Sequence, residues 1–271
     1  MRFSLVLPCQ VSLFLGVQHL SMKGMGFPQV MWQTMKLRLT AFPAPTADLR
    51  EPVWWDAVVG NPSDSRTSRP KIGELREEGI IDNGKLMLTI NPGVINWIFT
   101  AWEKQEPFPS VGPFENSETV FSDLMFRWLG VSPPPLQRLA FGAELIEPVA
   151  NKRAGYEKIS QILQTVRVDP AGSSDFLYQI NRPRTSSSGV EGLTINRLSK
   201  WAVIGVQPFR ITVGQSLLQS ISEEETFGCR LDLDINTAAD FKGELPKDKL
   251  TLIWKELVKL AHEISSGGDV A

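Results

Sequence analysis

The sequence predicts an α+β fold in which a mainly antiparallel sheet is covered by helices. Short β-favouring segments follow one another at hairpin spacing between residues 175 and 235, which favours antiparallel pairing over parallel crossovers. In each half of the chain, a segment with apolar residues at helical spacing comes after the strands, at 115–129 and at 247–264. This order is compatible with two similar α+β halves, although the two halves share no residue pattern.

The first half begins with a predicted strand at residues 10–17, which contains β-favouring valine and phenylalanine. Residues 29–39 are predicted to form a short amphipathic helix around Trp32, closed by Phe42-Pro43. Residues 85–100 form the clearest β-region, because apolar and polar residues alternate there before an Asn-Pro-Gly turn. The remaining elements expected in this half are an exposed Ser-, Pro- and Arg-rich loop at 60–71 and the helix at 115–129.

Three consecutive prolines, Pro133 to Pro135, cannot continue a helix and mark the internal boundary of the chain. They separate an N-terminal α+β half, residues 1–132, from a C-terminal α+β half, residues 136–271, and the two halves either pack as separate units or form one continuous domain. The second half is predicted to contain strands at 136–146, 175–181, 193–204 and 227–235, a flexible loop at 185–192, and helices at 156–163 and 247–264.

Composition excludes several classes of protein. The 271 residues carry 28 basic and 30 acidic side chains, so the strong positive field of a dedicated nucleic-acid binder is absent, although a local basic patch is compatible with these counts. The chain has two cysteines and two histidines. Cys9 and Cys229 are too far apart to form a zinc or disulfide motif, and are expected to be free thiols in a reducing compartment. His19 and His262 would need carboxylate help to bind a metal.

We expect a cytoplasmic protein with no membrane association. The N-terminal residues resemble a short signal peptide, but Pro8 and Gln10 interrupt the apolar run and no small-residue cleavage site follows. No segment reaches the roughly 18 to 20 apolar residues that a membrane-spanning helix needs.

The acidic segment Leu231-Asp232-Leu233-Asp234-Ile235 offers a first candidate site. Alternation along a strand places Asp232 and Asp234 on one face. Two carboxylates on one face could hold Mg²⁺ in a metal-dependent enzyme, but the sequence supplies no further ligands. The favoured interpretation is an acidic strand face that lies in water or forms ion pairs with arginine.

Basic and aromatic residues on the neighbouring β-segments offer a second candidate site. Arginine forks bind phosphate and tryptophan stacks on bases, so a nucleic-acid site could be built here if the segments lie side by side. The same basic residues could instead form cross-strand ion pairs with Asp232 and Asp234, which is an equally simple explanation of their presence. We therefore favour a structural or protein-contact role for them. The candidate residues are Arg182, Arg184, Arg197, Lys200 and Trp201.

No nucleophile elbow, P-loop or dinucleotide-binding motif is present in the sequence. We therefore expect no cofactor and assign no catalytic residue. Aromatic residues and arginine are enriched at protein interfaces, and both are frequent in the predicted elements. A protein partner is the favoured expectation, with nucleic acid and self-association as the alternatives.

The order of several short motifs along the chain resembles a family of bacterial and archaeal proteins. The family is sporadically distributed, of unknown function, and known mainly by its length and by a closing L-D-x-D strand followed by a helix. The resemblance implies no activity, cofactor or catalytic residue, and is consistent with an interaction component of a prokaryotic accessory or defence-type system. The motifs that carry it are Leu15-Gly16-Val17-Gln18, Phe42-Pro43, Leu88-Thr89-Ile90-Asn91, Asn96-Trp97, Phe121, Trp128, Ile195-Asn196-Arg197, Leu231-Asp232-Leu233-Asp234 and His262.

Overall fold

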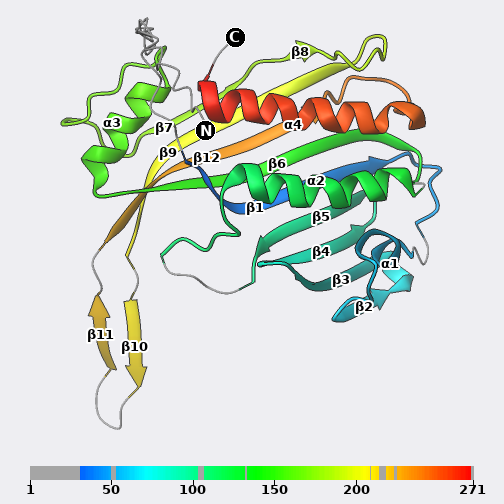
Figure 1. Cartoon of the computed structure of the whole chain (residues 1–271), viewed down its shortest axis with the longest axis horizontal. Coiled ribbons are helices and arrows are strands. Elements are labelled where there is room, and N and C mark those ends of the chain that lie inside the picture. Colours follow the sequence, from blue (N-terminus) through cyan, green and yellow to red (C-terminus); the bar gives the residue numbers. More distant parts are fainter. Residues whose placement is uncertain are drawn as a thin grey trace, which may run out of the picture.

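A long antiparallel sheet is the main feature of the computed structural model (Figure 1). The structure describes residues 31–49, 53–102, 107–131, 133–207, 209–213, 218–222 and 225–269. Within these residues ten strands form one sheet in the order β2-β3-β4-β5-β1-β6-β12-β9-β7, with β8 paired to β9. The strands are β1 (Gln33–Pro43), β2 (Ser65–Arg69), β3 (Glu74–Ile81), β4 (Gly84–Asn91), β5 (Val94–Ala101), β6 (Leu136–Val149), β7 (Leu177–Asn181), β8 (Arg184–Thr185), β9 (Thr194–Val206) and β12 (Thr226–Thr237).

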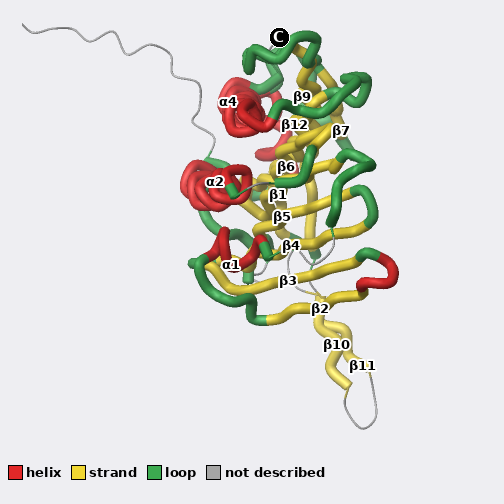
Figure 2. Tube along the Cα trace, turned by 90° about the vertical axis from the view of Figure 1, so that its right-hand side faces the viewer, coloured by secondary structure: helices red, strands yellow, loops and turns green. Residues whose placement is uncertain are grey.

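The α-helices of the described residues all pack on one face of this sheet, as Figure 2 shows for α1, α2 and α4. A separate hairpin, β10 (Phe209–Val213) with β11 (Leu218–Ser222), projects from the body of the molecule (Figure 1). The helices are α1 (Trp54–Val59), α2 (Phe114–Gly130), α3 (Lys152–Ile162) and α4 (Leu250–Gly267), with 3-10 turns η1 (Pro70–Ile72) and η2 (Lys247–Lys249).

The order of elements is repeated along the chain. When the short strands β2 and β8 and the hairpin β10-β11 are left out, the series β1-α1-β3-β4-β5-α2 is followed by the series β6-α3-β7-β9-β12-α4. Strands β1 and β6 pair in the middle of the sheet. The last strand of each series lies next to the first strand of the same series, β5 beside β1 and β12 beside β6. The hydrogen-bonded sheet is therefore continuous across the prolines that separate the two halves of the sequence.

The core lies between the sheet and the helices and is built largely from aromatic side chains. The indole of Trp97 on β5 stacks on that of Trp55 at 6.0 Å and meets that of Trp128 edge-on at 6.4 Å. The helices α2 and α4 are joined by a polar network, in which Trp254 donates to the Ser122 hydroxyl at 3.3 Å and Glu118 binds Ser122 and His262. Trp55, Trp97, Trp128 and Trp254 are therefore packing residues of the core.

The predicted fold class is confirmed, because a mainly antiparallel sheet is covered by helices. The predicted helix at 29–39 is wrong: these residues lead into the strand β1, where Leu37 and Leu39 are buried and alternate with Lys36 and Arg38. The loop predicted at 60–71 contains the exposed edge strand β2. The strand predicted at 10–17, together with Cys9 and His19, lies outside the described residues.

Candidate functional site

The face of the sheet opposite the helices, called the open face below, carries most of the polar side chains of the central strands. Strand alternation places Lys36 and Arg38 of β1 on this face, while Leu37 and Leu39 point into the core. Across β1, β6, β12 and β9, the open face has more basic than acidic side chains. They are Lys36, Arg38, Arg138, Arg230 and Lys200 against Glu144, Asp232 and Asp234.

One row of the open face is a chain of ion pairs, called the ion-pair ladder. Lys36 Nζ lies 2.7 Å from Glu144 Oε1, and Arg230 contacts both Glu144 at 3.2 Å and Asp232 at 2.7 Å. Lys200 Nζ lies 4.0 Å from Asp232 Oδ2 at the end of the row. Each pair is about a third exposed, so each contributes about 0–1 kcal/mol to stability. The ladder chiefly orients these five side chains, of which three are basic and two are acidic.

A second row, called the amide ladder, crosses β7, β9 and β12. The amide of Asn181 donates to Asn196 Oδ1 at 3.0 Å, and the amide of Asn196 donates to Asn236 Oδ1 at 3.1 Å. The amide of Asn236 in turn donates to Asp234 Oδ1 at 3.0 Å. Asp234 is therefore held by a neutral amide, whereas Asp232 is held by cations.

Between the two ladders lies the central hollow, formed by Arg38, Gly142 and Asp234, which are register partners on β1, β6 and β12. Gly142 has no side chain, and a Cβ there would lie 3.4 Å from Arg38 Nε and Nη2, so the guanidinium lies over the glycine. Two adjoining cavities of about 200 Å³ and 260 Å³ both have Arg38 and Asp234 in their walls. Within the described part of the chain, Arg38 makes no hydrogen bond or ion pair.

Asp232 and Asp234 lie on one face of β12, as the alternating sequence predicted. The expected cross-strand contact with a basic residue is present, between Lys200 and Asp232. Among the residues that the structure describes, no three histidine, cysteine, aspartate or glutamate side chains are close enough to hold a metal ion. The use of Asp232 and Asp234 as Mg²⁺ ligands stays a prediction.

Two of the predicted basic residues lie at the end of α4, on the helix side of the sheet. Arg182 donates to both carboxylate oxygens of Asp269, one of them at 2.9 Å, and Tyr178 donates to the same carboxylate at 2.6 Å. The hydrogen bond from Arg182 holds the pKa of Asp269 below its usual value, against the effect of burial. Arg184 pairs with Glu263 at 3.2 Å.

Strand alternation separates Lys200 from the other four predicted residues. Lys200 lies on the open face, whereas its neighbour Trp201 is fully buried on the helix side, with its ring 6.0 Å from that of Trp32. Arg197 is 2% exposed, and burial, with the nearby charge of Arg184, lowers its pKa. The five residues therefore do not form one patch, and Trp201 is not positioned to stack on a base.

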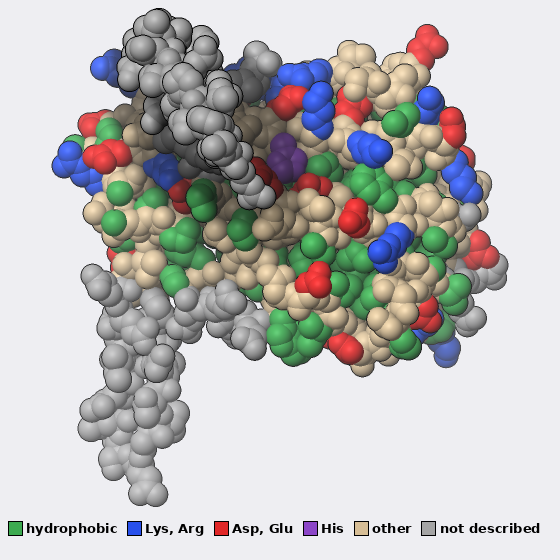
Figure 3. Space-filling model, viewed as in Figure 1, with side chains coloured by type: hydrophobic (Ala, Val, Ile, Leu, Met, Phe, Trp, Pro, Cys, Tyr) green, Lys and Arg blue, Asp and Glu red, His purple; other side chains and the backbone are tan. Residues whose placement is uncertain are grey.

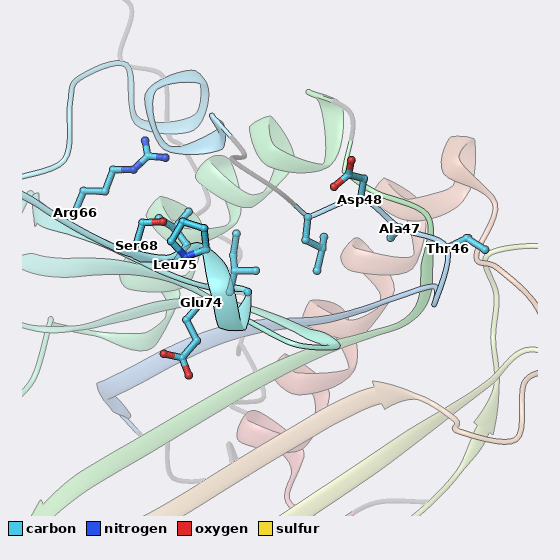
Figure 4. Close-up of a pocket in the computed structure, with 11 residues that line it drawn as sticks. Thr46, Ala47, Asp48, Arg66, Ser68, Glu74 and Leu75 are labelled. Atoms are coloured by element: carbon cyan, nitrogen blue, oxygen red, sulfur yellow. The ribbon is translucent and has the colours of Figure 1, made fainter.

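A larger cavity of about 850 Å³ lies at the edge of the sheet, between the chain that follows β1 and the strands β2 and β3. Figure 4 shows Arg66 on one side of it and Asp48 on the other, with Leu75 near the strands. Its charged strand residues are already paired, Arg66 with Glu77 at 3.3 Å and Glu74 with Arg69 at 3.4 Å. These ion pairs leave the strand side of the cavity without an uncompensated charge, so the cavity is a weaker candidate for a charged ligand.

Arg38 and Gly142, which shape the central hollow, were not among the site residues predicted from the sequence. Arg38 was missed because the surrounding residues were assigned to a helix. The strict alternation from Lys36 to Ala41 was the available signal for a strand. The role of Gly142 had no local signal, because it depends on the register of β6 against β1.

Comparisons with protein-family models, curated proteins and solved structures give no match for this chain. None of the described helices is long and apolar enough to span a bilayer. Function is therefore inferred from the geometry of the chain itself.

Proposed function

We propose that this chain is a non-enzymatic, protein-binding component that holds its partner on the open face. The observation that carries the proposal is that one complete face of a ten-stranded sheet has no helix over it in the described residues. Large apolar side chains are exposed near both of its ends, Ile80 on β3 at 48% and Leu177 on β7 at 60%. Arginine is enriched at protein interfaces and their rims are polar, so exposed apolar side chains together with arginines on one uncovered face support a protein partner.

The ion pairs of Arg182 and Arg184 favour a protein over a nucleic acid as the partner. Arg182 and Arg184 are neutralised by Asp269 and Glu263, and nucleic-acid binding depends on uncompensated basic side chains. On the helix side, basic and acidic side chains are interspersed without a field of one sign (Figure 3). Nucleic-acid binding and pairing with a second copy of this chain are kept as alternatives that the experiment separates.

We further propose that this chain acts in the cytoplasm of a prokaryote, as part of an accessory or defence-type system. The resemblance to a sporadic bacterial and archaeal family supports a prokaryotic accessory or defence-type system. The buried free thiol of Cys229 is compatible with the reducing cytoplasm.

Site-specific photocrosslinking in the native host tests the proposal. A photoreactive benzoylphenylalanine replaces Ile80 on the open face in one variant. In the matched control it replaces Leu252 on α4, which is 46% exposed on the helix side. We expect a discrete protein adduct from the Ile80 position only, and we expect Arg38→Glu to abolish it by changing the charge of the open face.

The identity of the adduct decides between the alternatives. Adducts from Leu252 alone, or none from either position, would contradict the use of the open face. A nuclease-sensitive adduct would support the nucleic-acid alternative, and an adduct of twice the chain mass would identify a second copy of this chain as the occupant.

A further inference from the structure

The central hollow contains a guanidinium that the fold itself does not use. On the same face, Lys36, Arg230 and Lys200 are each paired with a carboxylate in the ion-pair ladder. Arg38 has no such partner among the described residues, although Asp234 lies only two strands away in the same register row. A half-buried guanidinium without a partner is a ready site for an anion, because a charge-assisted pair with it is stronger than a neutral hydrogen bond.

The surroundings of Arg38 limit which anion fits. The carboxylate of Asp234 faces the same hollow and disfavours a multiply charged phosphate. It can accept a hydrogen bond from a peptide N–H, since only Asn236 is bonded to it in the described residues. The amide groups of Asn96 and Asn236 also line the second cavity. Each donates one N–H within the sheet, to Thr89 and to Asp234, and has a second N–H that can donate to a peptide carbonyl. A singly charged carboxylate on a peptide therefore matches the hollow better than a nucleic acid.

The two cavities follow one another along the strands and share Arg38 and Asp234 in their walls. They extend from the ion-pair ladder at Glu144 to Arg138 and Phe42 at the other end, along one face of β6. At about 3.3 Å per residue, an extended segment of about six residues would cover this length. The excess of basic over acidic side chains on the four central strands complements a segment that is itself acidic.

We propose that the central hollow binds an extended acidic segment of the partner protein, with one carboxylate seated on the guanidinium of Arg38 over Gly142. This inference rests on the proposed function and names the chemistry of the partner. Arg38 is the anchor, Gly142 leaves the space, and Asp234 receives an N–H of the bound segment.

The test is fluorescence anisotropy with three labelled peptides titrated against the full chain. The first alternates glutamate with valine, the second replaces every glutamate with glutamine, and the third replaces it with lysine. We expect binding of the first peptide only, with an affinity that falls as salt is raised. Arg38→Ala should weaken it at least about tenfold, because a charge-assisted contact is lost.

Two further variants separate binding from folding. Arg153→Ala removes an exposed arginine of α3 on the helix side and is expected to leave peptide binding unchanged. Gly142→Ala keeps every charge but places a methyl group under the guanidinium, and is expected to weaken binding with an unchanged circular dichroism spectrum. Equal binding of the glutamine peptide, or equal binding by the Arg38→Ala variant, would overturn the inference.

The outcomes also distinguish this inference from the proposed function. If the Ile80 crosslink forms and survives Arg38→Ala while no acidic peptide binds, the open face binds a protein but not through an acidic segment. If the crosslink is also absent, the proposed function fails as well. Arg38-dependent binding of a single-stranded oligonucleotide in place of the peptide would identify a phosphate site and overturn the inference.

Discussion

The guanidinium of Arg38 on β1 lies over Gly142, its register partner on β6. Gly142 is not one of the glycines with a positive φ, so backbone geometry does not require glycine there. The absence of a side chain instead leaves the space that becomes the central hollow. At Gly155 on α3 the absence of a side chain has another effect, because the helix packs closely against Val203 of β9.

Alanine substitutions at these two glycines should therefore differ in their effect on stability. A Cβ at Gly155 would lie 2.7 Å from Val203 Cγ1, and overpacking should reduce the free energy of unfolding by about 1–2 kcal/mol after the gain in helix propensity. A Cβ at Gly142 would lie 3.4 Å from the flexible end of Arg38 and in ordinary contact, at 3.7 Å, with Arg38 Cβ, so the free energy of unfolding should change by no more than about 0.5 kcal/mol. Urea denaturation measures both, and a Gly155→Ala variant more stable than wild type would contradict the packing of α3.

The contact between Arg182 and Asp269 should contribute a stability that is lost in acid. The native pKa of Asp269 lies below the ordinary value of 3.8, so the unfolded chain takes up a proton at a higher pH than the native state does. The stabilisation is complete above the unfolded pKa and disappears as pH falls through the native pKa. Asp269→Asn should lower the melting temperature by a few degrees at pH 7, and the difference from wild type should shrink below about pH 4.

The control for Asp269 is Asp240→Asn, because Asp240 is exposed and has no partner among the described residues. Between pH 2 and 7, the melting temperature of Asp240→Asn should equal that of the wild type. If Asp269→Asn lowers the melting temperature by the same amount at every pH, the contact acts through packing and not through charge.

The ionised carboxylate of Glu77 should lower stability, whereas that of Asp269 raises it. Its side chain is almost fully buried beside Arg66, and its Oε2 atom has no hydrogen-bond donor among the described residues. Burial raises the pKa of this carboxyl above 4.5, although Arg66 opposes the shift. Stability is then lost as pH rises from the unfolded pKa through the native pKa, and the loss is complete above it.

Glu77→Gln should therefore raise stability at pH 7 by about 1 kcal/mol, because a buried ionised group is replaced by a neutral one. The gain should diminish as pH falls through the native pKa of Glu77, which lies above 4.5, because the wild-type carboxyl is then neutral as well. Thermal melting measures the change, and Glu74→Gln on the same strand, at a more exposed ion pair, is the control. A loss of stability in Glu77→Gln would mean that the Arg66 ion pair outweighs the cost of burial.

The elements with long regular patterns could be predicted from the sequence, and those that depend on distant contacts could not. The alternation along β12 placed Asp232 and Asp234 on one face, and the apolar stripe of α4 was recognisable. The loop at 185–192 was predicted to be flexible, but the carboxylate of Glu256 accepts hydrogen bonds at 2.6 Å from the Ser186 hydroxyl and the Ser187 amide. Ser186 and Glu256 are 70 residues apart in the sequence, so no local pattern could predict this contact. The central hollow likewise depends on the register of three strands.

Cys229 on β12 should be unreactive in the native protein. The thiol is fully buried, its Sγ lies 3.5 Å from the carbonyl oxygen of Gly155, and burial raises its pKa to about 11, although Lys158 opposes the shift. Because the thiolate is the reactive form, disulfide exchange with an aromatic disulfide reagent should be slow at pH 8. The experiment uses a Cys9→Ser background, in which the rate of disulfide exchange at Cys229 should rise with pH and reach no plateau below pH 10.

In denaturant the exchange should become fast, and its rate should level off near the ordinary cysteine pKa of about 8.5. A native rate that already levels off near pH 8.5 would show that α3 does not cover the thiol in solution.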